Sequence, residues 1–120
     1  MTDTSIVADI VHLVRSARVD LSSEKAAQDD LEKLLDAAGI PYAREVRLSG
    51  RDIVDFTIGL VALELKLKGA NKKSVYRQLC RYAKHDGIET IVLASNLSMG
   101  LPPTIEGKPA YFVRLGEGWL

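Results

Sequence analysis

The sequence is poor in residues that cross-link a chain or bind a soft metal. Its 120 residues contain one cysteine, Cys80, and two histidines, His12 and His85. A single cysteine excludes an intramolecular disulfide, and these three side chains leave no cluster of zinc ligands. Cys80 lies inside a predicted helix, where a small buried residue is the simplest interpretation. Any metal is therefore expected to be bound by oxygen atoms.

Long apolar runs and a basic leader are also missing. No apolar stretch approaches the roughly 20 residues that span a bilayer. Asp3 and Asp9 stand near an N-terminus that has no basic segment before an apolar one. We therefore expect no signal peptide, no membrane partner and a cytoplasmic location. A chain of 120 residues with 47% hydrophobic and 27% charged residues is expected to form a single domain, residues 1–120.

The net charge of zero conceals a polarity along the chain. Residues 1–60 contain 7 Lys/Arg against 11 Asp/Glu, a net charge of −4, and residues 61–120 contain 9 against 5, a net charge of +4. One segment of the second half holds seven basic residues and no acidic one. These are Lys66, Lys68, Lys72, Lys73, Arg77, Arg81 and Lys84. Solvated surfaces usually mix both signs, so the segment favours a polyanionic partner over a plain solvated helix face.

Two segments in the middle of the chain carry the pattern that points to chemistry. Residues 53–58 have the composition of a strand, and residues 62–68 alternate leucine with charged side chains, which predicts a second strand with one buried face. A tight reversal between them makes a hairpin that can place Asp55 beside Glu64. The same alternation directs Lys66 to the side on which Glu64 lies.

Converging carboxylates followed by a lysine are typical of metal-dependent phosphodiester hydrolysis. Mg²⁺ or Mn²⁺ held by Asp55, Glu64 and the backbone carbonyl of Leu65 would keep several waters, one of which becomes the nucleophile. Lys66 would orient that water or offset charge on the phosphorus. A lone Glu-x-Lys pair on a strand is more often a solvated edge with a weak ion pair. The surrounding elements therefore decide between these two interpretations.

The remaining periodic segments predict an α/β fold with a mixed sheet. Residues 5–18 form an amphipathic helix that packs on the core or on another subunit. Residues 89–94 are continuously apolar, which indicates a central strand parallel to its neighbour. Ser74 is the expected N-cap of a helix after the strand hairpin. The other predicted elements are helices at residues 23–38 and 75–84 and strands at residues 42–48 and 110–115, with a loop at residues 96–109.

The predicted second helix places polar side chains at the rim of its apolar face. Glu24 and Gln28 lie one turn apart there, at the N-terminal end. They can supply a further metal or water ligand. The alternative is that Glu24 only complements the helix dipole.

Residues 22–95 resemble the PD-(D/E)xK nuclease superfamily. Asp55 stands at the PD aspartate, with Val54 in place of the proline, and Glu64-Leu65-Lys66 matches the (D/E)xK element. Gln78-Leu79-Cys80-Arg81-Tyr82 matches the QxxxY motif of the RecB-like and lambda-exonuclease-like branches. The small size is similar to virus-type replication-repair nucleases that stand alone and to archaeal Holliday junction resolvases.

The resemblance implies a restriction-endonuclease-like αβββαβ core in residues 22–95. An extra N-terminal helix would occupy residues 1–20, and a C-terminal loop and strand would occupy residues 96–120. It also implies a Mg²⁺- or Mn²⁺-dependent DNA nuclease, specific for structure more than sequence, that works as a homodimer. Recombination, repair or phage DNA processing in a bacterial, archaeal or phage-infected cell would be its setting.

The resemblance also assigns roles to individual residues. The catalytic residues would be Asp55, Glu64, Lys66, Gln78 and Tyr82. The metal ligands would be Asp55, Glu64, the carbonyl of Leu65 and Glu24. The phosphate contacts would be Lys68, Lys72, Lys73, Arg77 and Arg81. Two other classes stay open: a non-catalytic nucleic-acid-binding or assembly subunit with the same fold, and a protein-interaction domain without nucleic acid.

Overall fold

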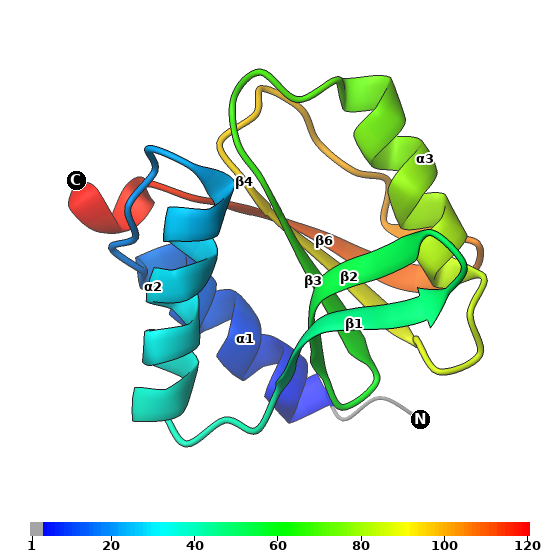
Figure 1. The fold of residues 1–120 in the computed structure, drawn as a ribbon, viewed down its shortest axis with the longest axis horizontal. Helices are drawn as coiled ribbons and strands as arrows, with labels where there is room; N and C mark the ends of the chain where they lie inside the picture. The colour runs from blue at the N-terminus through cyan, green and yellow to red at the C-terminus, as the bar shows by residue number, and fades with distance from the viewer. Residues whose placement is uncertain (1–3) are drawn as a thin grey trace.

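A mixed sheet of six strands with three α-helices packed on it makes up residues 4–120, the part of the chain that the computed structural model describes (Figure 1). The helices are α1 (Thr4–Ser16), α2 (Glu24–Ala37) and α3 (Lys72–Ala83). The strands are β1 (Ala43–Ser49), β2 (Asp52–Ile58), β3 (Val61–Lys66), β4 (Thr90–Ser95), β5 (Thr104–Ile105) and β6 (Lys108–Arg114). A 3-10 helix, η1, covers Glu117–Trp119. Among these residues no helix combines the length and the apolar character needed to cross a membrane.

The sheet has the order β1-β2-β3-β4-β6-β5, and its centre is parallel. Strands β1, β2 and β3 form an antiparallel meander, and β4 runs parallel to both β3 and β6. The continuously apolar β4 therefore lies in the middle of the sheet, as its sequence predicts. Gly59 has a φ of 57° in the reversal between β2 and β3, a conformation that glycine adopts at little cost.

Helices cover both faces of the central strands. Helices α1 and α2 pack with Leu63 and Leu65 on one face, and α3 packs with Ala62 and Leu93 on the other (Figure 1). All of β3 except Lys66 is buried. The prediction that residues 62–68 bury only one face was therefore wrong. Glu64, on the face that was expected to meet solvent, is buried against α3.

Helix α1 packs on the core of its own chain. Ile10 and Val14 on this helix have no exposed surface and belong to the same core as α2. This contact accounts for the inner apolar face of the helix without another subunit.

The ends of the helices follow side-chain caps. Ser23 caps α2 by accepting the backbone N–H of Ala26 at 3.0 Å. Helix α3 begins earlier than predicted, because Asn71 accepts the N–H of Ser74 at 3.0 Å. Asn71 is the N-cap, and the expectation for Ser74 was wrong. Asparagine and serine cap about equally well, so residue type alone does not choose between Asn71 and Ser74.

The end of β3 and the segment after β4 also differ from the sequence-based expectation. Strand β3 ends at Lys66 and not at residue 68, because the N–H groups of Leu67 and Lys68 donate to the side chains of Glu24 and Asn96. The predicted loop at residues 96–109 contains β5, which is two residues long. A strand this short leaves no periodic pattern in the sequence.

Candidate functional site

The predicted pair of carboxylates lies at a fork in the sheet. Backbone pairing of β2 with β3 ends at Phe56 and Leu63. Beyond this point the N–H of Asp55 donates to Oε1 of Glu64 at 2.9 Å, and the N–H of Leu65 donates to Oδ2 of Asp55 at 2.8 Å. The two carboxylates thus take the place of the next backbone–backbone hydrogen bonds between β2 and β3, and the strands separate there.

The backbone of Leu65 faces the same fork. The N–H and C=O of a strand residue point to the same side, so the carbonyl of Leu65 is directed to the side on which its N–H meets Asp55. The structure thereby brings together three of the four predicted metal ligands: Asp55, Glu64 and this carbonyl.

Lys66 and Tyr82 hold the other side of Glu64. The ammonium group of Lys66 lies 3.6 Å from Oε2 of Glu64, and its side chain is 20% exposed. The hydroxyl of Tyr82 on α3 lies 3.0 Å from the same oxygen and 2.7 Å from the carbonyl oxygen of Ile53. Because a hydroxyl donates one proton, it bonds one of these oxygens at a time or shares the proton between them. Helix α3 thus helps to position the carboxylate of Glu64 through Tyr82.

Burial makes it costly for both carboxyl groups to be charged at once. Burial and then the charge of Asp55 raise the pKa of Glu64 to about 8. Burial also raises the pKa of Asp55, while the N–H of Leu65 acts in the opposite direction. The pKa of Tyr82 is raised by burial and by Glu64, so the phenol keeps its proton. At neutral pH the pair therefore retains a proton, in a place where a cation can substitute for it.

The donor set of this pair fits a hard divalent cation. Three of the four carboxylate oxygens take the contacts described above. The fourth, Oδ1 of Asp55, takes part in none of these contacts. Mg²⁺ is usually bound by one or two carboxylates and completes its shell with water. Asp55 and Glu64 satisfy that requirement.

Glu24 lies near the pair without joining it. Its Oε2 accepts the N–H of Leu67 at 3.3 Å, and its charge raises the pKa of Asp55. No group of three or more His, Cys, Asp or Glu side chains within residues 4–120 is arranged to hold a metal ion. Gln28, one turn further along α2, accepts a hydrogen bond from Arg44 at 3.2 Å. The structure therefore brings neither of these side chains to the carboxylate pair.

A cationic cleft of about 490 Å³ adjoins Lys66. Gln78 and the predicted phosphate contacts Arg77 and Arg81 line it, together with Arg51 from the turn between β1 and β2. No acidic side chain of residues 4–120 lines this cleft. The QxxxY pair is therefore divided: Tyr82 contacts Glu64, and Gln78 lies on the wall of the cleft.

Two contributors to the cleft were missed at the sequence level. Arg51 follows a turn glycine and has no periodic neighbours, so only its tertiary position identifies it. Asp52 is 7% exposed, and its Oδ1 accepts Nε of Arg81 at 2.8 Å, while His85 lies 3.4 Å from its other oxygen. Arg81 is the main cause that lowers the pKa of Asp52. Asp52 thus fixes Arg81 at the cleft.

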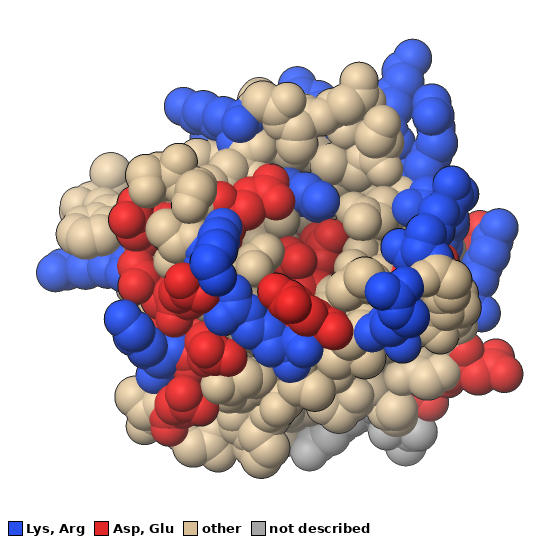
Figure 2. Space-filling view, in the orientation of Figure 1, with Lys and Arg blue, Asp and Glu red and all other residues tan. Residues whose placement is uncertain are grey.

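The remaining predicted phosphate contacts extend along α3. Lys72 and Lys73 are exposed in its first turn, and Lys68 is exposed just after β3. Figure 2 shows Lys and Arg gathered on the α3 side of this face, while over α2 Asp and Glu lie together with some Lys and Arg. The predicted basic surface is thus present and lies next to the carboxylate pair.

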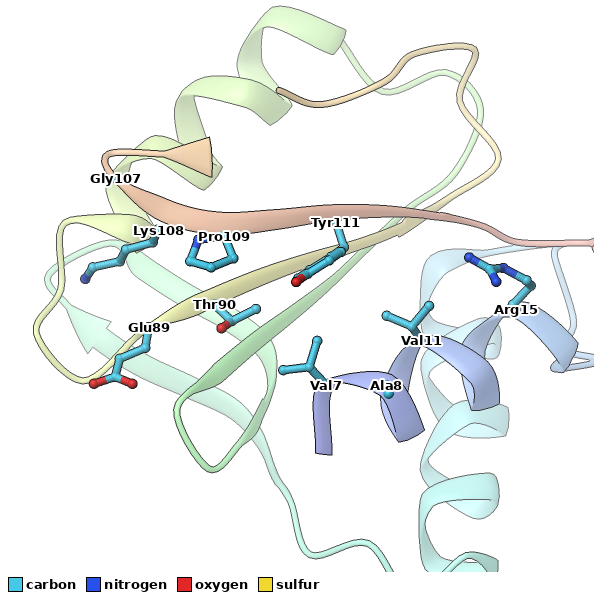
Figure 3. A pocket seen from close by; sticks show the side chains of 10 residues that line it. All are labelled: Val7, Ala8, Val11, Arg15, Glu89, Thr90, Gly107, Lys108, Pro109 and Tyr111. Carbon is cyan, nitrogen blue, oxygen red and sulfur yellow. The ribbon is translucent and has the colours of Figure 1, made fainter. Parts of the chain in front are cut away.

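A larger cavity, of about 660 Å³, lies away from this site (Figure 3). Val7 and Val11 of α1 face Tyr111 and Pro109 of β6 across it (Figure 3). It contains none of the side chains that the sequence singles out for chemistry.

Comparisons of the chain with protein-family models, with curated proteins and with solved structures found no match. The geometry of the residues described above is therefore the basis for assigning a function.

Proposed function

We propose that this chain is a divalent-metal-dependent DNA nuclease that hydrolyses phosphodiester bonds. The observation that carries the proposal is the fork between β2 and β3. There Asp55 and Glu64 each accept a backbone N–H of the opposite strand, and Lys66 lies 3.6 Å from Glu64. A cationic cleft begins beside them. Metal-assisted phosphodiester hydrolysis uses buried paired carboxylates next to a cationic surface, and carboxyl groups with strongly shifted pKa values gather at functional sites.

Each residue of the fork has a defined task in this proposal. Asp55, Glu64 and the carbonyl of Leu65 hold the ion, which when bound supplies a water of lowered pKa and polarises a phosphate oxygen. Lys66 donates hydrogen bonds to the attacking water or to the phosphate oxygens. Tyr82 fixes the rotamer of Glu64 through its hydroxyl. Glu24 acts on Asp55 through its negative charge, without a direct contact with the pair.

The cleft supplies the contacts to the sugar-phosphate backbone. Arg51, Arg77 and Arg81 offer guanidinium groups that pair with phosphates, and Gln78 offers an uncharged donor and acceptor. Such contacts position DNA but carry no sequence information. We therefore propose specificity for the structure of the DNA and not for its sequence, in recombination, repair or phage DNA processing.

The order of elements supports membership of the PD-(D/E)xK nuclease superfamily. The sequence α2, β1, β2, β3, α3, β4 is the αβββαβ order that the resemblance implies for a restriction-endonuclease-like core. Asp55 on β2, Glu64 and Lys66 on β3 and Tyr82 on α3 also lie together, which supports the resemblance. A homodimer remains part of this proposal, and sedimentation equilibrium tests it.

A cleavage assay across linear, nicked and branched DNA tests the proposed activity. With Mg²⁺ or Mn²⁺ the wild type should cleave at least one substrate, and chelation should stop the reaction. Glu64→Ala should abolish cleavage, and Lys66→Ala should lower its rate on the order of 10²- to 10³-fold. Glu32→Gln, which changes a carboxylate on α2, is the matched control and should cleave normally.

Cleavage by Glu64→Ala and Lys66→Ala at the wild-type rate would show that the assignment is wrong. DNA binding without cleavage, and without Mn²⁺ binding that needs Asp55, would favour the alternative of a non-catalytic nucleic-acid-binding subunit.

A further inference from the structure

A second hollow opens on the outer side of α3, next to the cationic cleft. Its volume is about 350 Å³, and its lining residues are Lys72, Lys73, Tyr76, Arg77 and Met99. Arg77 also lines the cleft, so the two depressions share one wall. The hollow is therefore a continuation of the surface that begins at Lys66.

The hollow is lined by the ring of Tyr76, which is not part of the buried core. Helix α3 is anchored to the sheet by Val75, Leu79 and Tyr82, all of them buried. Tyr76 points away from this face and is 38% exposed. A hydrogen bond with Cys80 raises the pKa of Tyr76, so the phenol stays neutral. An exposed neutral ring beside a thioether offers a flat apolar surface.

Cations surround this ring. Lys72, Lys73 and Arg77 make no ion pair with other residues of the segment 4–120 and so remain available for anions. A basic groove with an aromatic platform is the arrangement that binds single-stranded nucleic acid, because each base has a face that can stack. A base inside a duplex has both faces covered by its neighbours. The hollow therefore suits an unpaired nucleotide.

We propose that Tyr76 and Met99 form a stacking site for an unpaired nucleobase, so that the substrate carries single-stranded nucleotides near the scissile phosphate. This inference rests on the proposed function for its connection to cleavage. Tyr76 and Tyr82 are six residues apart on α3, about 9 Å along its axis, and Arg77 lines both the hollow and the cleft beside Lys66.

Equilibrium binding without cleavage tests the stacking site. The probe is a fluorescein-labelled oligothymidine of about 12 nucleotides, within the usual range of site sizes, with Ca²⁺ in place of Mg²⁺. Tyr76→Ala should weaken binding on the order of 5- to 150-fold, the effect of removing the stacking of one base. Tyr76→Phe should bind as the wild type does. A blunt duplex of the same length should bind equally to all three proteins.

Tyr111→Ala is the matched control. Tyr111 is a similarly exposed tyrosine, at 43%, and it lines the cavity beside α1 (Figure 3). Its replacement should leave the affinity for the single strand unchanged. Circular dichroism should show the same thermal unfolding for Tyr76→Ala and Tyr76→Phe, because neither variant changes the core.

The stacking site is overturned if Tyr76→Ala binds the single strand as tightly as the wild type, or if Tyr76→Phe is as weak as Tyr76→Ala. Equal decreases in affinity for Tyr76→Ala and Tyr111→Ala would also overturn it. Single-strand binding that needs Tyr76 in a protein that cleaves no DNA would support the stacking site and refute the nuclease. The two failures are thus distinguishable.

Discussion

Helices α2 and α3 flank the same sheet on opposite faces and carry opposite charge. Helix α2 contains five acidic and two basic side chains, and α3 contains four basic and no acidic ones. Figure 2 shows the two groups on different parts of one face of the molecule. The two helices use these charges differently.

The acidic side chains of α2 all have partners inside the protein. Asp29 and Glu32 pair with Arg44 at 2.8 and 3.3 Å. Each of the others accepts a hydrogen bond: Glu24 from Leu67, Asp30 from Asp20 and Asp36 from Tyr42. These charges therefore connect α2 to the neighbouring chain segments.

The basic side chains of α3 are used less within the fold. Within residues 4–120 only Arg81 of the four makes an ion pair, with Asp52 at 2.8 Å. A surface with unpaired charges of one sign attracts a partner of the opposite sign and raises its association rate. We therefore propose that the charges of α2 stabilise the fold, whereas those of α3 serve the binding of DNA.

The largest expected effect is on DNA affinity when α3 changes sign. Replacing Lys72, Lys73 and Arg77 together by Glu should weaken binding on the order of 10³-fold. The slope of log K against log salt should become shallower by about 0.7 to 0.9 for each phosphate that is no longer neutralised. The matched control, Lys25→Glu with Lys33→Glu on α2, should change affinity little. Equal decreases in affinity for both proteins would remove the distinction between the helices.

A smaller effect is expected on the free energy of unfolding, which should depend on the partners of the α2 carboxylates and not on the α3 cations. Arg44 is 18% exposed, pairs with two carboxylates of α2 and lies over the ring of Phe56 at 5.7 Å. Arg44→Ala should lower the free energy of unfolding by about 1 to 2 kcal/mol, because it removes the guanidinium contacts with Asp29 and Glu32 and the packing of the side chain on Phe56. Arg77→Ala on α3 should change it by less than about 0.5 kcal/mol. Urea denaturation measures both, and a similar decrease for Arg77→Ala would contradict the proposed difference between the helices.

The pH dependence of stability should also differ between structural and site carboxylates. Arg44 lowers the pKa of Asp29, so its contribution is present above its ordinary pKa and is lost as pH falls through the lowered value. Glu64 behaves in the opposite way. Its pKa is raised from 4.5 to about 8, so its contribution is complete below about pH 4.5 and is lost as pH rises through about 8.

Glu64→Gln should therefore lose less stability than the wild type as pH rises toward 9 without divalent ions. The difference should be on the order of 1 to 2 kcal/mol, measured by urea denaturation at a series of pH values. Parallel curves for the two proteins would mean that Glu64 titrates normally.

The sequence was sufficient for the parts of the site that depend on local pattern. The hairpin that places Asp55 beside Glu64 follows from two short strands and a turn glycine. Tyr82 reaches the site because it shares the inner face of an amphipathic helix with Leu79 and Val75. In these cases periodicity alone determines which side chains meet.

The rest of the site depends on contacts between distant segments. The fork between β2 and β3 exists because carboxylates replace backbone partners, and no residue pattern records that exchange. Asp52 meets Arg81, and Arg51 enters the cleft, only after α3 packs across the meander. Glu24, which the sequence offered as a metal ligand, is held at the rim by the N–H of Leu67.

Calorimetric titration with Mn²⁺ at neutral pH, in two buffers of different ionisation enthalpy, tests the central claim most directly. The wild type should bind the ion and release close to one proton, because Glu64 has a pKa of about 8 and must ionise to bind the metal. Glu64→Gln and Asp55→Asn should weaken binding by at least about 100-fold, and Glu32→Gln on α2 should bind normally. A wild type that binds no Mn²⁺, or a Glu64→Gln protein that binds it equally well, would contradict the assignment of this pair as a metal centre.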